Sequence, residues 1–267
     1  MMPAMPSARV GDAIIHYRET GSGNDVVLLL HAFPLHSGMW APQLSSLAAR
    51  FRVVAPDYRG LGASREAPAA STMELLAGDV LGLLRQLGIR RAAVAGLSMG
   101  GYVALELYRR APELFRGLAL CATKATPDTA EAKAAREAFA RDALAKGLGW
   151  VADEFAPKLL RPKGDPEVLA TVRALVRDGT PEGVAAAQRG MALRVDSVPT
   201  LARVGCPSLV LHGEEDQLVP SGEAQRMAQT LRGGRMVRVP GAGHLVNLEN
   251  PGAFGAALSA FASALPA

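Results

Sequence analysis

The segment VAGLSMGGYVAL, residues 94–105, constrains the fold more than any other part of the sequence. An apolar run ends at Gly96, a single serine follows at Ser98, and after Gly100 an apolar pattern resumes at helical spacing. A serine in a very tight turn between a strand and a helix adopts unfavourable backbone angles, so its neighbours must be small. The spacing G-x-S-x-G is that of a nucleophile turn, although an ordinary glycine-rich turn can contain the same pattern. The rest of the chain has to distinguish these two interpretations.

Strand-like segments alternate with helix-like ones on both sides of this turn. In the segment 71–88 the apolar residues recur at helical intervals, and Ser71 and Glu74 have the spacing of a capping box. Strands that alternate with helices form a parallel sheet that helices cover on both faces, so we predict an α/β fold with a mostly parallel sheet. Further helices are expected after Ser98, near 221–231 and at the end of the chain. The predicted strands are 8–19, 24–33, 51–57, 91–96, 115–121, 207–213 and 235–241.

The alternation stops between residues 122 and 203. This stretch is rich in alanine, helical in character and interrupted at Pro162–Gly164 and at Pro181. We therefore predict a helical cap at 122–203, inserted into a core formed by 1–121 and 204–267. The apolar residues of this cap are expected either to roof the site as an acyl or alcohol pocket or only to hold the cap on the core. They include Trp150, Val151, Phe155, Leu159 and Leu160.

Composition narrows the possible partners. The chain has 267 residues, of which 49% are hydrophobic and 20% charged, and its net charge of +4 is spread without a run of Lys and Arg that would suit nucleic acid. The start of the sequence lacks the basic and apolar regions of a signal peptide, and no apolar run has the length of a membrane span. Cys121 and Cys206 fall near opposite ends of the predicted sheet, about 15 Å apart, which is too far for a disulfide. We expect a cytoplasmic protein whose partner is a small molecule, and the sequence leaves the oligomeric state open.

Three loops carry the residues that a serine nucleophile requires. A serine is a poor nucleophile at neutral pH and needs a base within hydrogen-bond distance, which an acid orients in turn. Asp216 follows the predicted strand 207–213, and His244 follows the predicted strand 235–241. Functional groups collect at the carboxyl ends of parallel strands, so we predict that Ser98, His244 and Asp216 form a catalytic triad.

Other residues compete for two of these roles. His31 and His212 also end strands on the same side of the sheet, but His31 is expected to brace the loop backbone, and a Gly-Ala-Gly loop presents His244. Asp57 and Arg59 are expected to brace a turn. The competitors of Asp216 for the role of the acid are Glu214, Glu215 and Asp128.

The chain order serine, aspartate, histidine is that of an α/β-hydrolase, and the sequence resembles this family over nearly its whole length. The segment HAFP at 31–34 resembles the family's His-Gly loop, and DYRGLGAS at 57–64 resembles its turn after the next strand. GLSMGG, together with RGMALRVDSVPTLARVGCPSLVLHGEEDQLVP, is most similar to small bacterial esterases, to the 3-oxoadipate enol-lactonase group and to cofactor-free haloperoxidases.

An oxyanion hole needs two backbone N–H groups aimed at the developing negative charge. One is expected from Met99, directly after the nucleophile. The resemblance implies that the other comes from Phe33. The sequence departs from the family at Ala32, where glycine is usual, and alanine resists a positive φ, so this loop either tolerates a β-carbon or shifts its geometry.

These residues predict a serine hydrolase that cleaves carboxylic esters through an acyl-enzyme, with no metal and no organic cofactor. Two alternatives remain. An enol-lactonase would need cations in its pocket, and Arg189 and Arg194 are candidates, although both are more typical of surface or salt-bridge residues. A small-molecule receptor with vestigial catalysis would use the same fold, and the complete triad argues against it. The predicted pocket residues are Trp150, Phe155 and Arg194.

Overall fold

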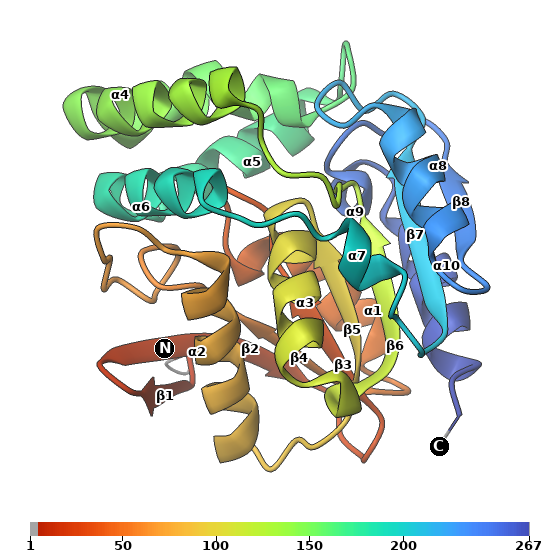
Figure 1. Cartoon of the computed structure of the whole chain (residues 1–267). Coiled ribbons are helices and arrows are strands. Elements are labelled where there is room, and N and C mark those ends of the chain that lie inside the picture. The colour runs from red at the N-terminus through yellow and green to blue at the C-terminus, as the bar shows by residue number, and fades with distance from the viewer. Residues whose placement is uncertain (1–4, 267) are drawn as a thin grey trace.

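One sheet of eight strands forms the centre of the structure, a computed structural model that describes residues 5–266 (Figure 1). The strand order is β1-β2-β4-β3-β5-β6-β7-β8. Strands β3 to β8 run parallel, whereas β1 and β2 pair antiparallel at one edge. The strands are β1 Ser7–Val10, β2 Ala13–Thr20, β3 Val26–Leu30, β4 Arg52–Pro56, β5 Ala92–Leu97, β6 Phe115–Cys121, β7 Ser208–Gly213 and β8 Arg235–Val239.

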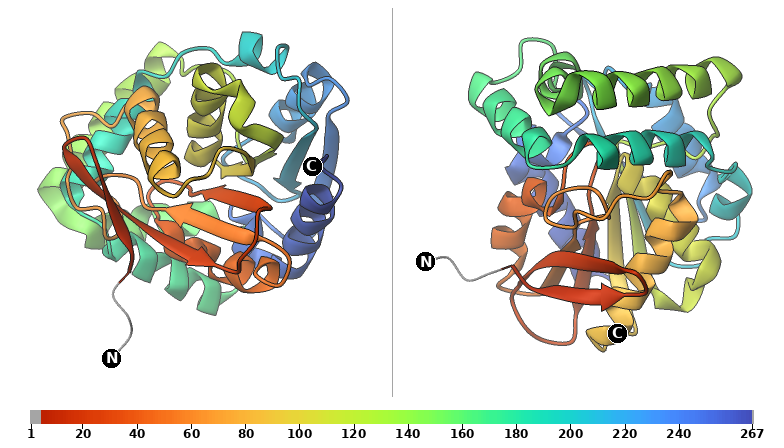
Figure 2. Two further views of the ribbon diagram at one scale, coloured as in Figure 1. Left: turned by 90° about the horizontal axis from the view of Figure 1, so that it is seen from below. Right: turned by 90° about the vertical axis from the view of Figure 1, so that its left-hand side faces the viewer.

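Helices cover both faces of this sheet, which confirms the predicted α/β architecture. Helices α2, α3 and α8 lie on one face, and α1 and α10 lie on the other (Figure 2, left). Every residue of β3, β5 and β6 is buried, as expected for central parallel strands. The helices are α1 Ala41–Leu47, α2 Met73–Gln86, α3 Met99–Arg110, α4 Ala130–Phe155, α5 Pro166–Arg177, α6 Pro181–Ala192, α7 Val198–Leu201, α8 Ser221–Thr230, α9 Val246–Glu249 and α10 Pro251–Ser263.

Two local predictions were wrong. The segment 8–19, predicted as one strand, is the β1–β2 hairpin, because Gly11 turns the chain with a φ of 59°. The N-cap of α2 is Thr72, whose Oγ1 accepts from the Leu75 amide at 3.2 Å, and not Ser71. The first error merged two antiparallel strands into one, and the second shifted the helix cap by one residue.

Helices α4, α5 and α6, hereafter the cap helices, lie above the carboxyl edge of the sheet (Figure 1). The Ser71 amide donates to the Ala186 carbonyl at 2.9 Å, which ties α6 to the core. Gly183 approaches Gly60 so closely that a β-carbon at either position would overlap the other residue's backbone. The short helix α7 packs instead against α3 and α8, so the predicted cap boundary at residue 203 stays a prediction. No helix within residues 5–266 has both the length and the apolar character that crossing a membrane requires.

Candidate active site

The turn that carries Ser98 lies between β5 and α3 at the centre of the sheet. Ser98 has a φ of 55° and a ψ of −116°, a strained conformation for a residue with a β-carbon. Its amide donates to the Cys121 carbonyl at 2.9 Å, and its carbonyl accepts from Thr123 Oγ1 at 2.7 Å. These bonds to β6 and the loop after it hold the strained turn in place.

The two glycines around Ser98 are required by backbone packing. A β-carbon at Gly96 would overlap the Gly100 carbonyl, and a β-carbon at Gly100 would overlap the carbonyl of Leu30 on β3. The G-x-S-x-G pattern at residues 96–100 therefore reflects a helix that starts directly against two buried strands.

Asp216 and His244 meet at the same edge of the sheet. Nδ1 of His244 lies 2.9 Å from Oδ2 of Asp216 and 3.2 Å from Oδ1. The carboxylate also accepts from the amides of Leu218 at 2.8 Å and Val219 at 3.0 Å, and its side chain is fully buried. Burial alone would raise the pKa of Asp216, but the charge and hydrogen bond of His244 and the two amides outweigh it and lower that pKa. Asp216 is therefore held as a carboxylate against the imidazole.

The competing acids lie elsewhere. Glu214 and Glu215 are exposed at the exit of β7, and Glu215 faces Arg161 at 3.9 Å. Asp128 pairs with Arg194, Arg136 and Lys124, and the two arginines lower its pKa despite its burial. The structure thus brings Asp216, and none of these three, to His244.

Ser98 and His244 both line one cavity of about 290 Å³ between the sheet edge and the cap helices. The loop that carries His244 is fixed by the Gly243 amide, which donates to Glu249 Oε2 at 2.7 Å, and by the Leu245 amide, which donates to the Leu159 carbonyl at 3.0 Å. A larger cavity of about 400 Å³ lies at the opposite, amino edge of the sheet, and neither Ser98, Asp216 nor His244 lines it. Size alone therefore does not select the candidate site, and we choose the smaller cavity because Ser98 and His244 both line it.

The two candidate oxyanion donors differ in position: Met99 directly follows Ser98, and only Phe33 itself lines the cavity. Met99 is the first residue of α3, so its N–H has no acceptor within the helix, and the helix dipole favours negative charge there. Phe33 lines the cavity. Ala32 is fully buried and is not among the positive-φ residues of the described chain, so the loop accommodates the β-carbon with an ordinary φ.

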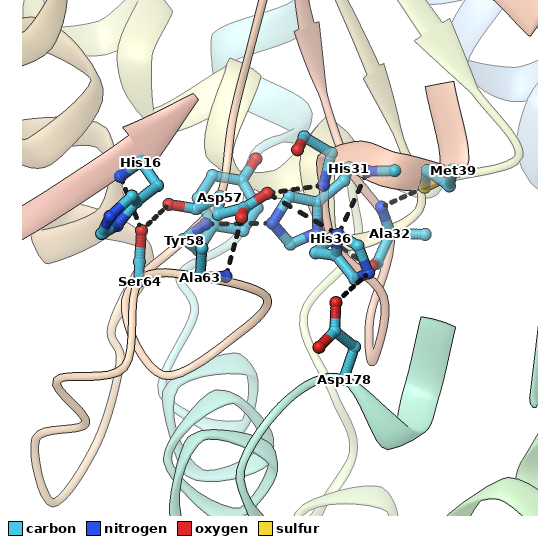
Figure 3. A network of polar contacts seen from close by, with 12 residues as sticks. His16, His31, Ala32, His36, Met39, Asp57, Tyr58, Ala63, Ser64 and Asp178 are labelled. Atoms are coloured by element: carbon cyan, nitrogen blue, oxygen red, sulfur yellow. Dashed lines mark hydrogen bonds and ion pairs between the residues drawn. The ribbon is translucent and has the colours of Figure 1, made fainter. Parts of the chain in front are cut away.

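His31 and Asp57 brace this loop, as the sequence indicated. The Tyr58 amide donates to Nε2 of His31 at 3.0 Å, so Nδ1 carries the proton and faces the Ala32 carbonyl at 3.0 Å (Figure 3). Burial lowers the pKa of His31 to about 4. Asp57 accepts from the Ser37 amide at 2.7 Å and from the Ala63 amide at 2.9 Å.

The predicted pocket residues differ in position. Phe155 lines the cavity, whereas Trp150 packs against Phe139 with ring centroids 5.2 Å apart. Arg194 is held by Asp128 and lies over the ring of Tyr102 at 4.4 Å, so this ring and not the guanidinium borders the cavity.

Three polar lining residues were missed in the sequence. Lys124, Arg136 and Gln188 line the cavity together with Phe33, Phe139 and Phe155. Lys124 follows β6 by three residues, and its place at the carboxyl edge was a usable signal. No pattern distinguishes Arg136 from the other helical arginines. Within residues 5–266, no group of three or more His, Cys, Asp and Glu side chains is arranged to hold a metal ion.

This sheet, its strained serine turn and the positions of Asp216 and His244 are those of an α/β-hydrolase architecture. The chain belongs to the Alpha/beta hydrolase family, which it matches over residues 27–257.

Individual relatives resemble the chain over nearly its full length. It is 32% identical to a pimeloyl-[acyl-carrier protein] methyl ester esterase of Nitrosomonas europaea, over 91% of this chain and 97% of that protein. A solved thermophilic esterase from Thermogutta terrifontis, with malate bound, has a TM-score of 0.91 and 38% identity over 96% of each chain. The enol-lactonase from Burkholderia xenovorans LB400 has a TM-score of 0.89 and 32% identity, over 97% of this chain and 100% of that one.

Proposed function

We propose that this protein is a serine hydrolase that cleaves carboxylic esters of small molecules through an acyl-enzyme intermediate. The observation that carries the proposal is the buried Asp216–His244 pair, which opens onto the cavity that Ser98 also lines. The names of two relatives, an esterase of Nitrosomonas europaea and one of Thermogutta terrifontis, support the same reaction class.

In this mechanism Ser98 Oγ attacks the ester carbonyl carbon. Because Nδ1 of His244 faces Asp216, Nε2 is the nitrogen that takes the serine proton and returns it to the leaving alcohol. Asp216 fixes the imidazole tautomer and stabilises the imidazolium. The amides of Met99 and Phe33 would hold the oxyanion, and water then attacks the acyl-enzyme, again with His244 as the base.

A panel of p-nitrophenyl and alkyl esters, assayed with purified protein, tests this proposal. We expect hydrolysis of at least the short-chain esters and a loss on the order of 10³ or more in Ser98→Ala. The absence of any Ser98-dependent hydrolysis would favour the alternative of a non-catalytic receptor on the same fold.

A second candidate, a lactonase of the 3-oxoadipate type, is supported by the cations of the cavity. Lys124 and Arg136 both line the cavity, and although both pair with Asp128, Arg194 adds a third cation to this one carboxylate, so the cluster has a net positive charge. Such a charge suits a substrate whose second end is a carboxylate. The sequence suggested Arg189 and Arg194 as the cations of such a pocket, but Lys124 and Arg136 border the cavity instead. Monomethyl adipate compared with methyl hexanoate provides the test: Arg136→Gln should raise KM about tenfold for the former and leave the latter unchanged. Equal effects on both esters would remove the case for an anionic substrate.

The two cysteines support the proposed cytoplasmic setting. Both Cys121 and Cys206 are unpaired, and burial raises the pKa of both thiols, that of Cys206 to about 11. Such thiols pack as small apolar groups and are unreactive at neutral pH.

A further inference from the structure

The loop of residues 31–36, hereafter the oxyanion loop, carries the candidate oxyanion amide of Phe33. On the side of the core it is held by His31, which accepts from the Tyr58 amide, and by Asp57, which accepts from the amide of Ser37 directly after the loop (Figure 3). These contacts fix the two ends of the loop to the turn that follows β4.

The end of the loop also reaches the cap. Nδ1 of His36 accepts from the Gly38 amide at 3.1 Å, so the proton of the neutral ring is on Nε2. That nitrogen lies 3.5 Å from Oδ2 of Asp178, the residue that follows α5 (Figure 3). Burial lowers the pKa of His36, although the charges of Asp57 and Asp178 oppose this. The contact with Asp178 is this 3.5 Å approach and not a hydrogen bond, since Nε2 of His36 has no hydrogen-bond partner.

The cap segment that receives this contact is itself anchored. Arg65 donates to the Gly179 carbonyl at 2.8 Å and faces Asp178 at 3.5 Å. Thr180 Oγ1 donates to the Gly60 carbonyl at 3.1 Å. Asp178 therefore stands on a segment of defined position and not on a free loop end.

The oxyanion loop touches the cap at a second point. The ring of Phe33 packs edge-on against Phe139 and Phe155 of α4, with centroids 6.1 and 5.6 Å apart. The short loop is thus held between the core on one side and two different cap elements on the other. Its backbone cannot shift without moving against one of them.

We propose that the His36–Asp178 contact is a positioning link, through which the cap fixes the oxyanion loop for catalysis. His36 and Asp178 are positioning residues, because they act through the loop and do not line the cavity. The inference rests on the proposed ester hydrolysis. A displaced oxyanion donor weakens an interaction made mainly in the transition state, so loss of the link should lower kcat and leave KM nearly unchanged.

Matched variants separate this link from general stability. His36→Asn keeps an acceptor at the Nδ1 position for the Gly38 amide but loses the reach to Asp178, whereas His36→Gln keeps a donor at the Nε2 position. Asp178→Ala removes the acceptor. Asp153→Ala is the control, because Asp153 is as exposed as Asp178, at 59% and 60%, and pairs with Arg173 and Arg177 within the cap.

We expect kcat to fall about three- to tenfold in His36→Asn and in Asp178→Ala, with KM within twofold of wild type, because a partial shift costs less than the 10²–10³ of a deleted donor. The double variant of His36→Asn and Asp178→Ala should have a kcat no lower than that of the slower single variant. His36→Gln should have a kcat between those of His36→Asn and wild type. Asp153→Ala should have the kcat of wild type. Equal kcat in all variants, or additive losses in the double variant, would overturn the link.

Hydrogen exchange provides a readout that does not depend on activity. The amides of Ser37, Gly38 and Met39 donate within this region, to Asp57, His36 Nδ1 and the His36 carbonyl. Their protection should fall in Asp178→Ala and stay unchanged in Asp153→Ala, and unchanged protection in both would refute the link. A wild-type protein without Ser98-dependent hydrolysis would refute only the proposed function, since the exchange comparison would still decide the link.

Discussion

The core loops and the cap helices meet at one cavity but are specified in different ways. At the core edge, backbone packing between β3, β5 and α3 requires glycine at two positions. A β-carbon at Gly96 or at Gly100 would overlap neighbouring backbone atoms. In the cap, the same close packing occurs where α6 meets the core, at Gly183 and Gly190, whereas Gly149 of α4 has open space around it. The turn around Ser98 therefore tolerates little change, whereas the part of the cap away from the α6–core contact has fewer backbone constraints.

The largest effect is expected at the acid. Asp216→Asn should lower kcat by up to about 10⁴ with the fold intact, because the amide would favour the wrong imidazole tautomer. Glu214→Gln and Glu215→Gln, which change exposed residues of the same loop, should cost less than about tenfold. Steady-state kinetics on one ester decides this, and an Asp216→Asn activity within tenfold of wild type would show that the acid is misassigned.

The next effect sharpens the contrast between a core glycine and a cap glycine. Gly100→Ala should lower the free energy of unfolding by about 3 kcal/mol or more, or prevent folding, because the β-carbon overlaps the Leu30 carbonyl. Gly149→Ala in α4 meets nothing within 4 Å and should raise stability by about 0.5–1 kcal/mol, since alanine favours a helix. Urea unfolding of both variants provides the test, and similar changes in the two would contradict the distinction.

The dependence of stability on pH should also separate core from cap. The folded-state pKa of His31 is about 4, below its ordinary 6.5, so between these values the unfolded chain binds the proton and stability falls with acidity by about 3 kcal/mol. His31→Gln, which keeps an acceptor for the Tyr58 amide, should flatten this dependence of stability on pH.

Asp128, whose pKa is lowered, stabilises the fold above its unfolded-state pKa and loses this effect only at lower pH. Asp128→Asn should therefore lower the free energy of unfolding at pH 7 but leave its change between pH 6.5 and 4 as in wild type. Urea midpoints measured across this pH range provide the test. A pH dependence that flattens in Asp128→Asn and not in His31→Gln would contradict the assignment.

The smallest effect concerns the wall of the cavity. Phe155→Ala should change the ratio of kcat/KM between short and long esters by about tenfold, because its ring borders the cavity directly. Trp150→Ala should change it less, because Trp150 packs behind Phe139. If neither profile moves while stability falls, both residues are only structural.

Much of the fold was predictable because its signals are local. The apolar strands and the helix 71–88 follow from periodicity, and the positions of Ser98, Asp216 and His244 follow from the rule that loops after parallel strands share one edge. The hairpin at 8–19 was missed because alternation continues through Gly11, and Thr72 was missed because two adjacent hydroxyl residues can both serve as N-caps.

The polar side of the cavity was harder to predict. Arg194 and Arg136 lie on neighbouring cap segments and both pair with Asp128, so only the three-dimensional packing decides which of them borders the cavity. The link between His36 and Asp178 joins residues 142 positions apart through a 3.5 Å approach that no local pattern encodes. Contacts between core and cap depend on how two units dock, and sequence periodicity does not report docking.

The central claim is that Ser98 is an activated nucleophile at the core edge, and covalent labelling tests it most directly. An organophosphonate should modify the native protein at a single site, and peptide mass spectrometry should place the adduct on Ser98. Ser98→Ala should remain unlabelled, keep its fold and lose ester hydrolysis by on the order of 10³ or more. An adduct on another residue, or turnover by Ser98→Ala near the wild-type rate, would contradict the account.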